Sequence, residues 1–134
     1  MELIDLVGEH LLSGVDFSTE SIETWDHHFE NCQVINFVLD GITYIASEDP
    51  DDGYRSSMRE IVVSDYVVSN RFPAIRVMGK MRDPGAYEND VIELYDIKNG
   101  KLVLAVGTGD TNDYYPYWVA EFIPENMSIN ISRE

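Results

Sequence analysis

A β-hairpin is encoded in residues 32–49, CQVINFVLDGITYIASED, and it limits the folds that are open to this chain. Asp40-Gly41 stands between two apolar runs and suits a two-residue type I′ turn, which needs positive φ at both positions. Pairing outward from the turn keeps one face apolar or aromatic throughout, so the pattern and the turn specify the same register. The predicted pairs are Leu39/Ile42, Phe37/Tyr44 and Ile35/Ala46 on that face, and Val38/Thr43, Asn36/Ile45 and Val34/Ser47 on the other.

A second hairpin is predicted around Asn99-Gly100 in VIELYDIKNGKLVLAVG, again between two apolar runs. A two-residue turn there gives the pairs Ile97/Leu102 and Tyr95/Leu104, with Leu94 facing Ala105 on the opposite side.

Three further segments have the β-branched and aromatic composition of strands. They are residues 61–68, 74–81 and 117–123, although a short helix around 57–62 is an alternative for the first. Alternation in the last strand predicts Trp118, Ala120 and Phe122 on one face and Tyr117, Val119 and Glu121 on the other.

Helices are predicted only near the N-terminus. ELIDLVGEHLL, residues 2–12, places an apolar stripe at helical spacing, although Gly8 weakens it. SIETWDHHFE, residues 21–30, places Ile22, Trp25 and Phe29 at the same spacing. We therefore expect a single α+β domain over residues 1–134, mainly antiparallel sheet built from hairpins with one or two short N-terminal helices.

The charge of the chain is strongly asymmetric. The formal net charge is -16, and residues 1–54 contain 13 acids and no Lys or Arg, because Arg55 is the first base. Such a field repels nucleic acid and anionic membranes and attracts basic protein surfaces. The alternative is that the charge serves solubility alone. One stretch is basic, residues 71–82 with Arg71, Arg76, Lys80 and Arg82, and we expect it to lie beside the acidic half as a counterweight.

The first candidate loop, residues 48–54, follows the first hairpin directly. It combines the acids Glu48, Asp49, Asp51 and Asp52 with Tyr54 and Arg55. A calcium loop is disfavoured, because Gly53 falls at the fifth position, where an oxygen ligand is needed, and the preceding element is a strand. The remaining interpretations are a solvated turn and a contact loop.

The second candidate loop is residues 107–115 within GTGDTNDYYPYW. Its two glycines lack the Lys and the following helix of a phosphate-binding loop. Its aromatic residues are of a type enriched at protein interfaces, although covering a sheet edge is an equal explanation. The candidate binding residues in this loop are Asp110, Asp113, Tyr114 and Tyr115.

No catalytic arrangement is evident, so we expect no enzyme, no cofactor and no metal site. His27 and His28 are adjacent and point about 100° apart on a helix, and His10 is remote in sequence. Cys32 is the single cysteine, which excludes an internal disulfide, and it has no evident basic neighbour. Because the first residues lack a positively charged start, a cytoplasmic location is expected.

The order of segments resembles that of small acidic proteins of unassigned function encoded by bacteriophages and prophages. The resemblance is carried by LVGEHLLSGVDF, FVLDGITYIASEDPDDGYRS and NGKLVLAVGTGDTNDYYPYW. It implies an accessory protein in the host cytoplasm, some of which inhibit host defence by binding a nuclease or other nucleic-acid machinery. It assigns no functional residue.

These observations favour a non-enzymatic protein that occupies a basic groove on a nucleic-acid-handling partner. A second hypothesis is a small-molecule or divalent-cation binder that uses the acidic loops 48–54 and 107–115. A third is an oligomeric structural module, such as a homodimer that pairs through an exposed sheet edge.

Overall fold

The computed structural model describes residues 1–23, 28–49, 57–82, 90–109 and 116–129. Strands account for 71% of these residues and form one antiparallel sheet in the order β4-β3-β2-β1-β5-β6-β7-β8. The elements are η1 (Leu3–Leu6), β1 (Gly8–Glu23), β2 (His28–Leu39), β3 (Ile42–Asp49), β4 (Ser57–Val63), β5 (Arg71–Met81), β6 (Asp90–Asp96), β7 (Leu102–Gly109), β8 (Tyr117–Phe122) and η2 (Pro124–Asn126), where η denotes a 3-10 helix.

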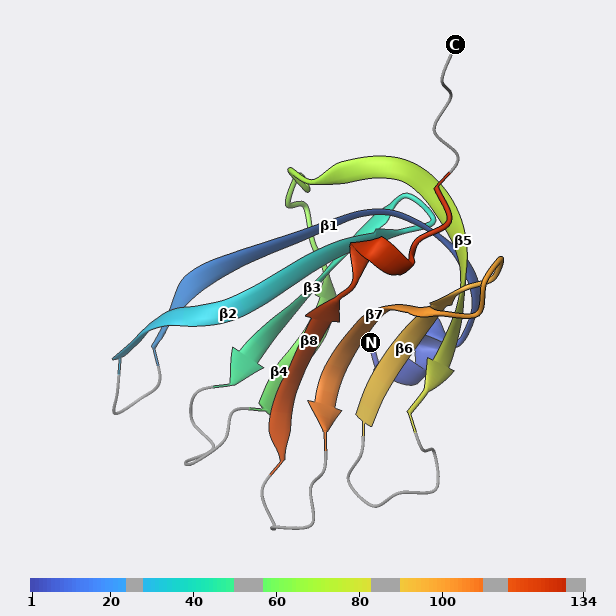
Figure 1. Ribbon diagram of the computed structural model, residues 1–134. Coiled ribbons are helices and arrows are strands. Elements are labelled where there is room, and N and C mark those ends of the chain that lie inside the picture. The colour runs from blue at the N-terminus through green and yellow to red at the C-terminus, as the bar shows by residue number, and fades with distance from the viewer. Residues whose placement is uncertain (24–27, 50–56, 83–89, 110–115, 130–134) are drawn as a thin grey trace.

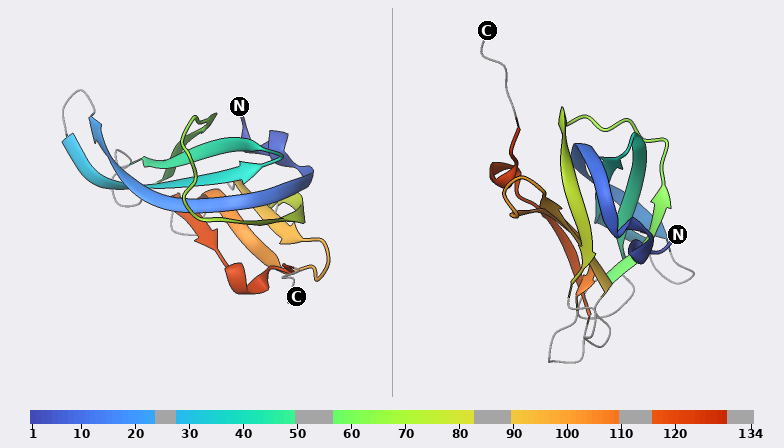
Figure 2. Two further views of the ribbon diagram at one scale, coloured as in Figure 1. Left: turned by 90° about the horizontal axis from the view of Figure 1, so that it is seen from above. Right: turned by 90° about the vertical axis from the view of Figure 1, so that its right-hand side faces the viewer.

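The sheet folds over on itself, so that its two halves form two layers around an apolar core (Figures 1 and 2). β1 takes part in both layers, because its first half pairs with β5 and its longer second part pairs with β2. The register shifts between Leu12 and Gly14, where β1 changes partners. Such irregularities bend a strand and increase its twist.

The hairpin at Asp40-Gly41 is confirmed. Both residues have positive φ, 54° and 81°, as a type I′ turn requires. All six predicted pairs between β2 and β3 are present. On the inner face all the predicted residues are buried except Ile42, which lies beside the turn and is 44% exposed.

The hairpin at Asn99-Gly100 exists, but its predicted register is wrong. Only Gly100 has a positive φ there, so the connection is not a two-residue type I′ turn. Instead the buried Asp96 accepts the backbone N–H groups of Lys98 and Ser128 and widens the loop. The observed pairs are Tyr95/Leu102, Leu94/Leu104 and Glu93/Ala105, in place of Ile97/Leu102, Tyr95/Leu104 and Leu94/Ala105.

The predicted N-terminal helices are wrong, and the described residues contain no α-helix, so the α+β class is not confirmed. Residues 2–12 form a single 3-10 turn and then enter β1 at Gly8, whose φ is 121°. Residues 21–23 end β1 and residues 28–30 begin β2, while 24–27 lie outside the described residues. Strand pairing therefore overrides the helical spacing of the apolar residues, with β5 for the first segment and between β1 and β2 for the second.

The other predicted strands are largely confirmed as β5 and β8. The segment at 61–68 differs, because β4 occupies Ser57–Val63 and residues 64–70 leave the sheet. The helix considered around 57–62 is therefore wrong. In β8 the predicted alternation holds: Trp118, Ala120 and Phe122 pack on the main core, and Val119 packs with Val91 and Ala105 on the other face.

Residues 64–70, here named the strap, connect the edge strand β4 to β5, which lies beyond β1. This return beside the first strand is a Greek-key connection. Val68 is buried against Gly14. The Tyr66 hydroxyl donates to the buried carboxylate of Asp16 at 2.5 Å, and Asn70 Nδ2 lies 3.4 Å from the same carboxylate. Asp16 thus fastens the strap to the outer face of β1.

Replacing Asp16 by Asn should lower the free energy of unfolding by about 1–3 kcal/mol at neutral pH, because a buried charge-assisted acceptor is lost. The Tyr66 hydrogen bond lowers the pKa of Asp16 below its usual 3.8. The ionised Asp16 carboxylate therefore stabilises the native state above that pH, and this stabilisation is lost as the pH falls below it. In urea unfolding, the difference in the free energy of unfolding between wild type and Asp16→Asn should become smaller below pH 3.8. Asp65→Asn, at an exposed strap residue, should leave the free energy of unfolding almost unchanged. Equal losses of stability in the Asp16 and Asp65 variants would show that Asp16 does not fasten the strap.

Close packing of η1 on β5 depends on Gly79. A Cβ atom built there would lie 2.4 Å from the backbone oxygen of Leu6 and 3.2 Å from a methyl group of Leu94. Leu3 and Leu6 of η1 are both buried in the core. We therefore expect Gly79→Ala to destabilise the protein by roughly 1–3 kcal/mol, as overpacking does. Thermal unfolding tests this, with the exposed Thr19→Ala expected to stay within about 0.5 kcal/mol of wild type. If Gly79→Ala is as stable as wild type, η1 does not pack this closely on β5.

Candidate functional site

β1 and β2 extend beyond the rest of the sheet as a two-stranded ribbon, seen at the left of Figure 1. β5 pairs with β1 only as far as Gly14, and β3 pairs with β2 only from Val34 onward. Residues 19–23 and 28–33 therefore have a strand neighbour on one side alone, and we call them the arm. Its register shifts between Glu20 and Ile22, opposite Asn31, whose φ of 59° marks a β-bulge.

The arm carries acidic side chains and no Lys or Arg among its described residues. Glu20, Glu23 and Glu30 are all exposed. His28 lies between two of these carboxylates, with its Nδ1 3.1 Å from Glu23 Oε1 and its Nε2 3.5 Å from Glu30 Oε1. The arm is consequently a protruding anionic ribbon, and the only basic side chain among its described residues is the imidazole of His28.

More carboxylates gather where the arm joins the sheet. Glu48 Oε1 accepts the backbone N–H of Gln33 at 3.0 Å, just beyond the last β2–β3 pair. Cys32 is buried beside this contact. Burial raises the pKa of the Cys32 thiol, and the carboxylates of Glu48, Glu20 and Asp49 raise it further. The pKa of Cys32 therefore responds to carboxylates from β1 and β3, and Arg59 of β4 acts in the opposite direction.

An apolar element accompanies these charges. Phe17 is 49% exposed and borders a hollow of about 310 Å³, with Ser18, Thr19 and Gln33 as the other lining residues. Gln33 Oε1 accepts the indole N–H of Trp118 at 3.0 Å, which ties the floor of this region to β8. A half-exposed aromatic ring beside a hollow and an acidic rim is an arrangement common at protein interfaces.

The two candidate loops begin and end at strand ends that lie close together. β4 approaches β7 and β8, and the Met58 backbone N–H donates to Thr108 Oγ1 at 2.9 Å.

Of the predicted binding residues, Glu48 and Asp49 are at the end of β3 and both are half-buried. The others lie outside the described residues: Asp51, Asp52, Tyr54, Arg55, Asp110, Asp113, Tyr114 and Tyr115.

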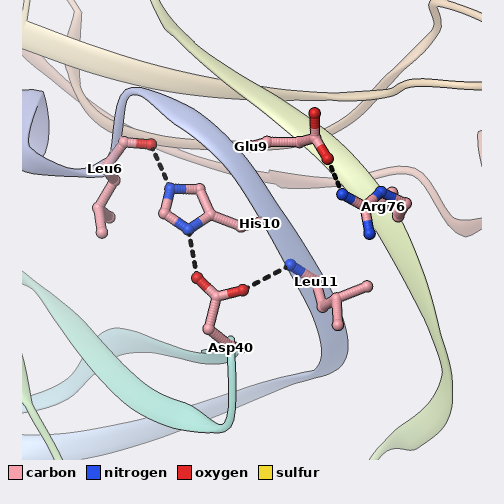
Figure 3. A network of polar contacts seen from close by, with 6 residues as sticks. All are labelled: Leu6, Glu9, His10, Leu11, Asp40 and Arg76. Carbon is pink, nitrogen blue, oxygen red and sulfur yellow. Dashed lines mark hydrogen bonds and ion pairs between the residues drawn. The ribbon is translucent and has the colours of Figure 1, made fainter.

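Several acids from the first 54 residues do not join this surface. Asp16 holds the strap, and Glu9 forms an ion pair with Arg76. Asp40 contacts His10 Nδ1 at 2.6 Å and accepts the Leu11 backbone N–H at 2.9 Å (Figure 3). These hydrogen bonds lower the pKa of the Asp40 carboxyl. The acids are thus divided between structural contacts near the hairpin turn and the arm with its base.

The His10–Asp40 pair has the composition of a catalytic dyad but not its arrangement. His10 Nε2 lies 2.8 Å from the Leu6 carbonyl oxygen, so both ring nitrogens already face acceptors (Figure 3). No ring nitrogen is left to take a proton from a nucleophile. The pair therefore clamps η1 and the β2–β3 turn to β1. Among the described residues there is also no group of three side chains suited to hold a metal ion.

The basic stretch 71–82 is only partly the expected counterweight. Arg76 of this stretch forms an ion pair with Glu9, an acid of the first 54 residues. Arg82 instead binds Glu93 at 2.8 Å, and Lys80 lies 5.7 Å from the centre of the Tyr95 ring. Lys80 and Tyr95 also border an open hollow of about 560 Å³ on β5 and β6. The acids of the arm are therefore not neutralised by this stretch.

Sequence reasoning missed the arm because it assigned residues 21–30 to a helix. The signal that was present is the run STESIET, residues 18–24, in which four of the seven residues are Ser or Thr and therefore weak helix formers.

Comparison with known proteins adds no relative: no protein-family model matches the sequence, and no curated protein or solved structure is significantly similar to it. The helices of the described chain include none with the length and apolar character that crossing a membrane demands. The candidate surface therefore rests on its geometry alone.

The base of the arm can be tested through Cys32. Because the thiol is buried and its pKa is raised, Ellman's reagent should react with the native protein at least about a hundredfold more slowly than with the unfolded protein. Glu20→Gln removes one of the charges that disfavour the thiolate and should accelerate the native reaction slightly. Comparable rates in native and unfolded protein would show that the base of the arm is not packed as described.

Proposed function

We propose that this protein is a non-enzymatic binding protein whose acidic arm enters a basic groove on a partner protein. The carrying observation is the arm itself: Glu20, Glu23 and Glu30 project from a ribbon that no third strand covers, and the described residues of the arm include no Lys or Arg. A ribbon about 10 Å wide is narrow enough to enter a groove that a globular surface could not.

A nucleic-acid-handling protein is the natural partner, because its groove is built to attract negative charge. Acids held at fixed positions on a strand would occupy that groove and exclude the nucleic acid. This proposal is consistent with an inhibitor or accessory protein of the type found in bacteriophages. Electrostatic attraction would raise the association rate most strongly at low ionic strength.

The two other hypotheses have less support. The cation-binding hypothesis depends on loop residues that lie mostly outside the described chain, and the described residues hold no group of three side chains suited to a metal ion. Self-association through the arm would bring like charges together, which opposes pairing.

The proposal predicts that neutralising the arm weakens capture of a basic partner. The triple variant Glu20→Gln, Glu23→Gln and Glu30→Gln keeps the side-chain size and removes three charges. Used as bait in a bacterial lysate at about 50 mM salt, it should retain at least about tenfold less of the partner than wild type does. The matched control Asp65→Asn, Asp90→Asn and Glu125→Gln removes the same charge from exposed residues outside the arm and should behave like wild type.

Raising the salt to about 500 mM should release the partner from wild type, because the screening length shortens to a few ångströms. Mass spectrometry should identify a protein with a basic surface. Retention of the same partner by the triple variant, or at high salt, would contradict the proposed function.

A further inference from the structure

The second half of β1 presents an unpaired strand edge. The Val15 backbone N–H donates to Asn70 O at 3.2 Å, so the backbone of Val15 faces the side where β5 lies. Backbone groups two residues apart in a strand face the same side, and the β1–β2 register is regular from Gly14 to Glu20. The backbone of Phe17 and Thr19 therefore faces this edge as well. No β5 residue pairs there, because that ladder ends at Gly14.

The available edge begins at the carbonyl group of Phe17. The N–H of Phe17 interacts with the neighbouring Asp16 carboxylate, which is one of the smaller causes of the lowered pKa of that acid. The Phe17 carbonyl and both backbone groups of Thr19 have no backbone partner among the described residues. An edge of this kind is a template for one more antiparallel or parallel strand.

The two faces beside this edge differ in chemistry. Phe17 and Thr19 share the inner face with Gln33, and these three residues, together with Ser18 at the strand edge, border the hollow of about 310 Å³. Ser18 and Glu20 share the outer face, with more acids at the base of the arm. A strand added at this edge would therefore meet an aromatic surface on one side and carboxylates on the other.

We propose that the partner binds by adding an extended segment to the β1 edge at Phe17–Thr19, with apolar side chains toward the inner hollow and Lys or Arg toward Glu20. This inference rests on the proposed function and specifies how the basic partner is held. Charge complementarity selects this occupant, because a second copy of the acidic arm would place carboxylates against carboxylates. Backbone hydrogen bonds supply affinity and the alternating side chains supply selectivity.

The test uses three synthetic peptides with equal charge and the full-length protein. The first alternates Lys and Val over eight residues, the second has the same composition in two blocks, and the third is the alternating peptide with N-methyl groups on every second amide. We expect the alternating peptide to bind at least tenfold more tightly than either of the others. Amide hydrogen exchange measured by NMR should slow at Thr19 when that peptide is bound.

Thr19→Pro removes the edge N–H without removing a β1–β2 hydrogen bond, because the Thr19 backbone faces away from β2. It should abolish the preference for the alternating peptide, whereas Thr19→Ala should retain it. Circular dichroism and thermal unfolding confirm that the variants are folded. If Thr19→Pro does not fold, the N-methylated peptide on wild-type protein decides the question alone.

Equal binding of all three peptides, weakened by salt and by the triple arm variant, would overturn strand addition and leave the acidic binding function standing. A dimer of the free protein in sedimentation that Thr19→Pro dissociates would assign the edge to a second copy and overturn the proposal. If no peptide binds and no basic partner is captured from the lysate, the proposed function is overturned as well.

Discussion

The carboxylate of Asp16 lies at the point where β1 loses β5 as its neighbour, and the rest of the architecture depends on this contact. It holds the strap through Tyr66 and Asn70, so that the chain can pass from the edge strand β4 to the far side of β1. One buried acid therefore holds the connection between the two halves of the sheet against β1, just beyond the last β1–β5 pair at Gly14.

Local turn chemistry made the first hairpin predictable from sequence. Asp40 and Gly41 both accept positive φ, and the register follows from the apolar alternation on either side. The second hairpin has the same signature but a different structure, because Asp96 takes its hydrogen bonds from Lys98 and from Ser128, 32 residues away in sequence. No local pattern reveals such a distant contact. The N-terminal helices failed for a similar reason, since pairing with strands that are distant in sequence or across a turn outweighs helical spacing.

The sequence predicts that the candidate surface is acidic, but it does not predict which residues form that surface. Charge asymmetry indicated an acidic surface, and Glu48 does lie where carboxylates gather, around Cys32. The sequence could not separate these acids from Asp16 and Asp40, which are committed to structural contacts. The arm was not foreseen, because its protrusion depends on where two neighbouring strands stop pairing, at Gly14 and Val34. The positions at which β5 and β3 stop pairing are set by the folded sheet and not by the residues of the arm.

The bond from the Trp118 indole to Gln33 joins residues 85 positions apart. The ribosome delivers the chain from its N-terminus, so β1 and β2 emerge long before β8. The base of the arm therefore acquires its last fixed contact only when synthesis is nearly finished. Until then a nascent chain has the acidic residues of the arm but not the contact with β8 that supports its base, and a product truncated before Trp118 would lack that contact permanently.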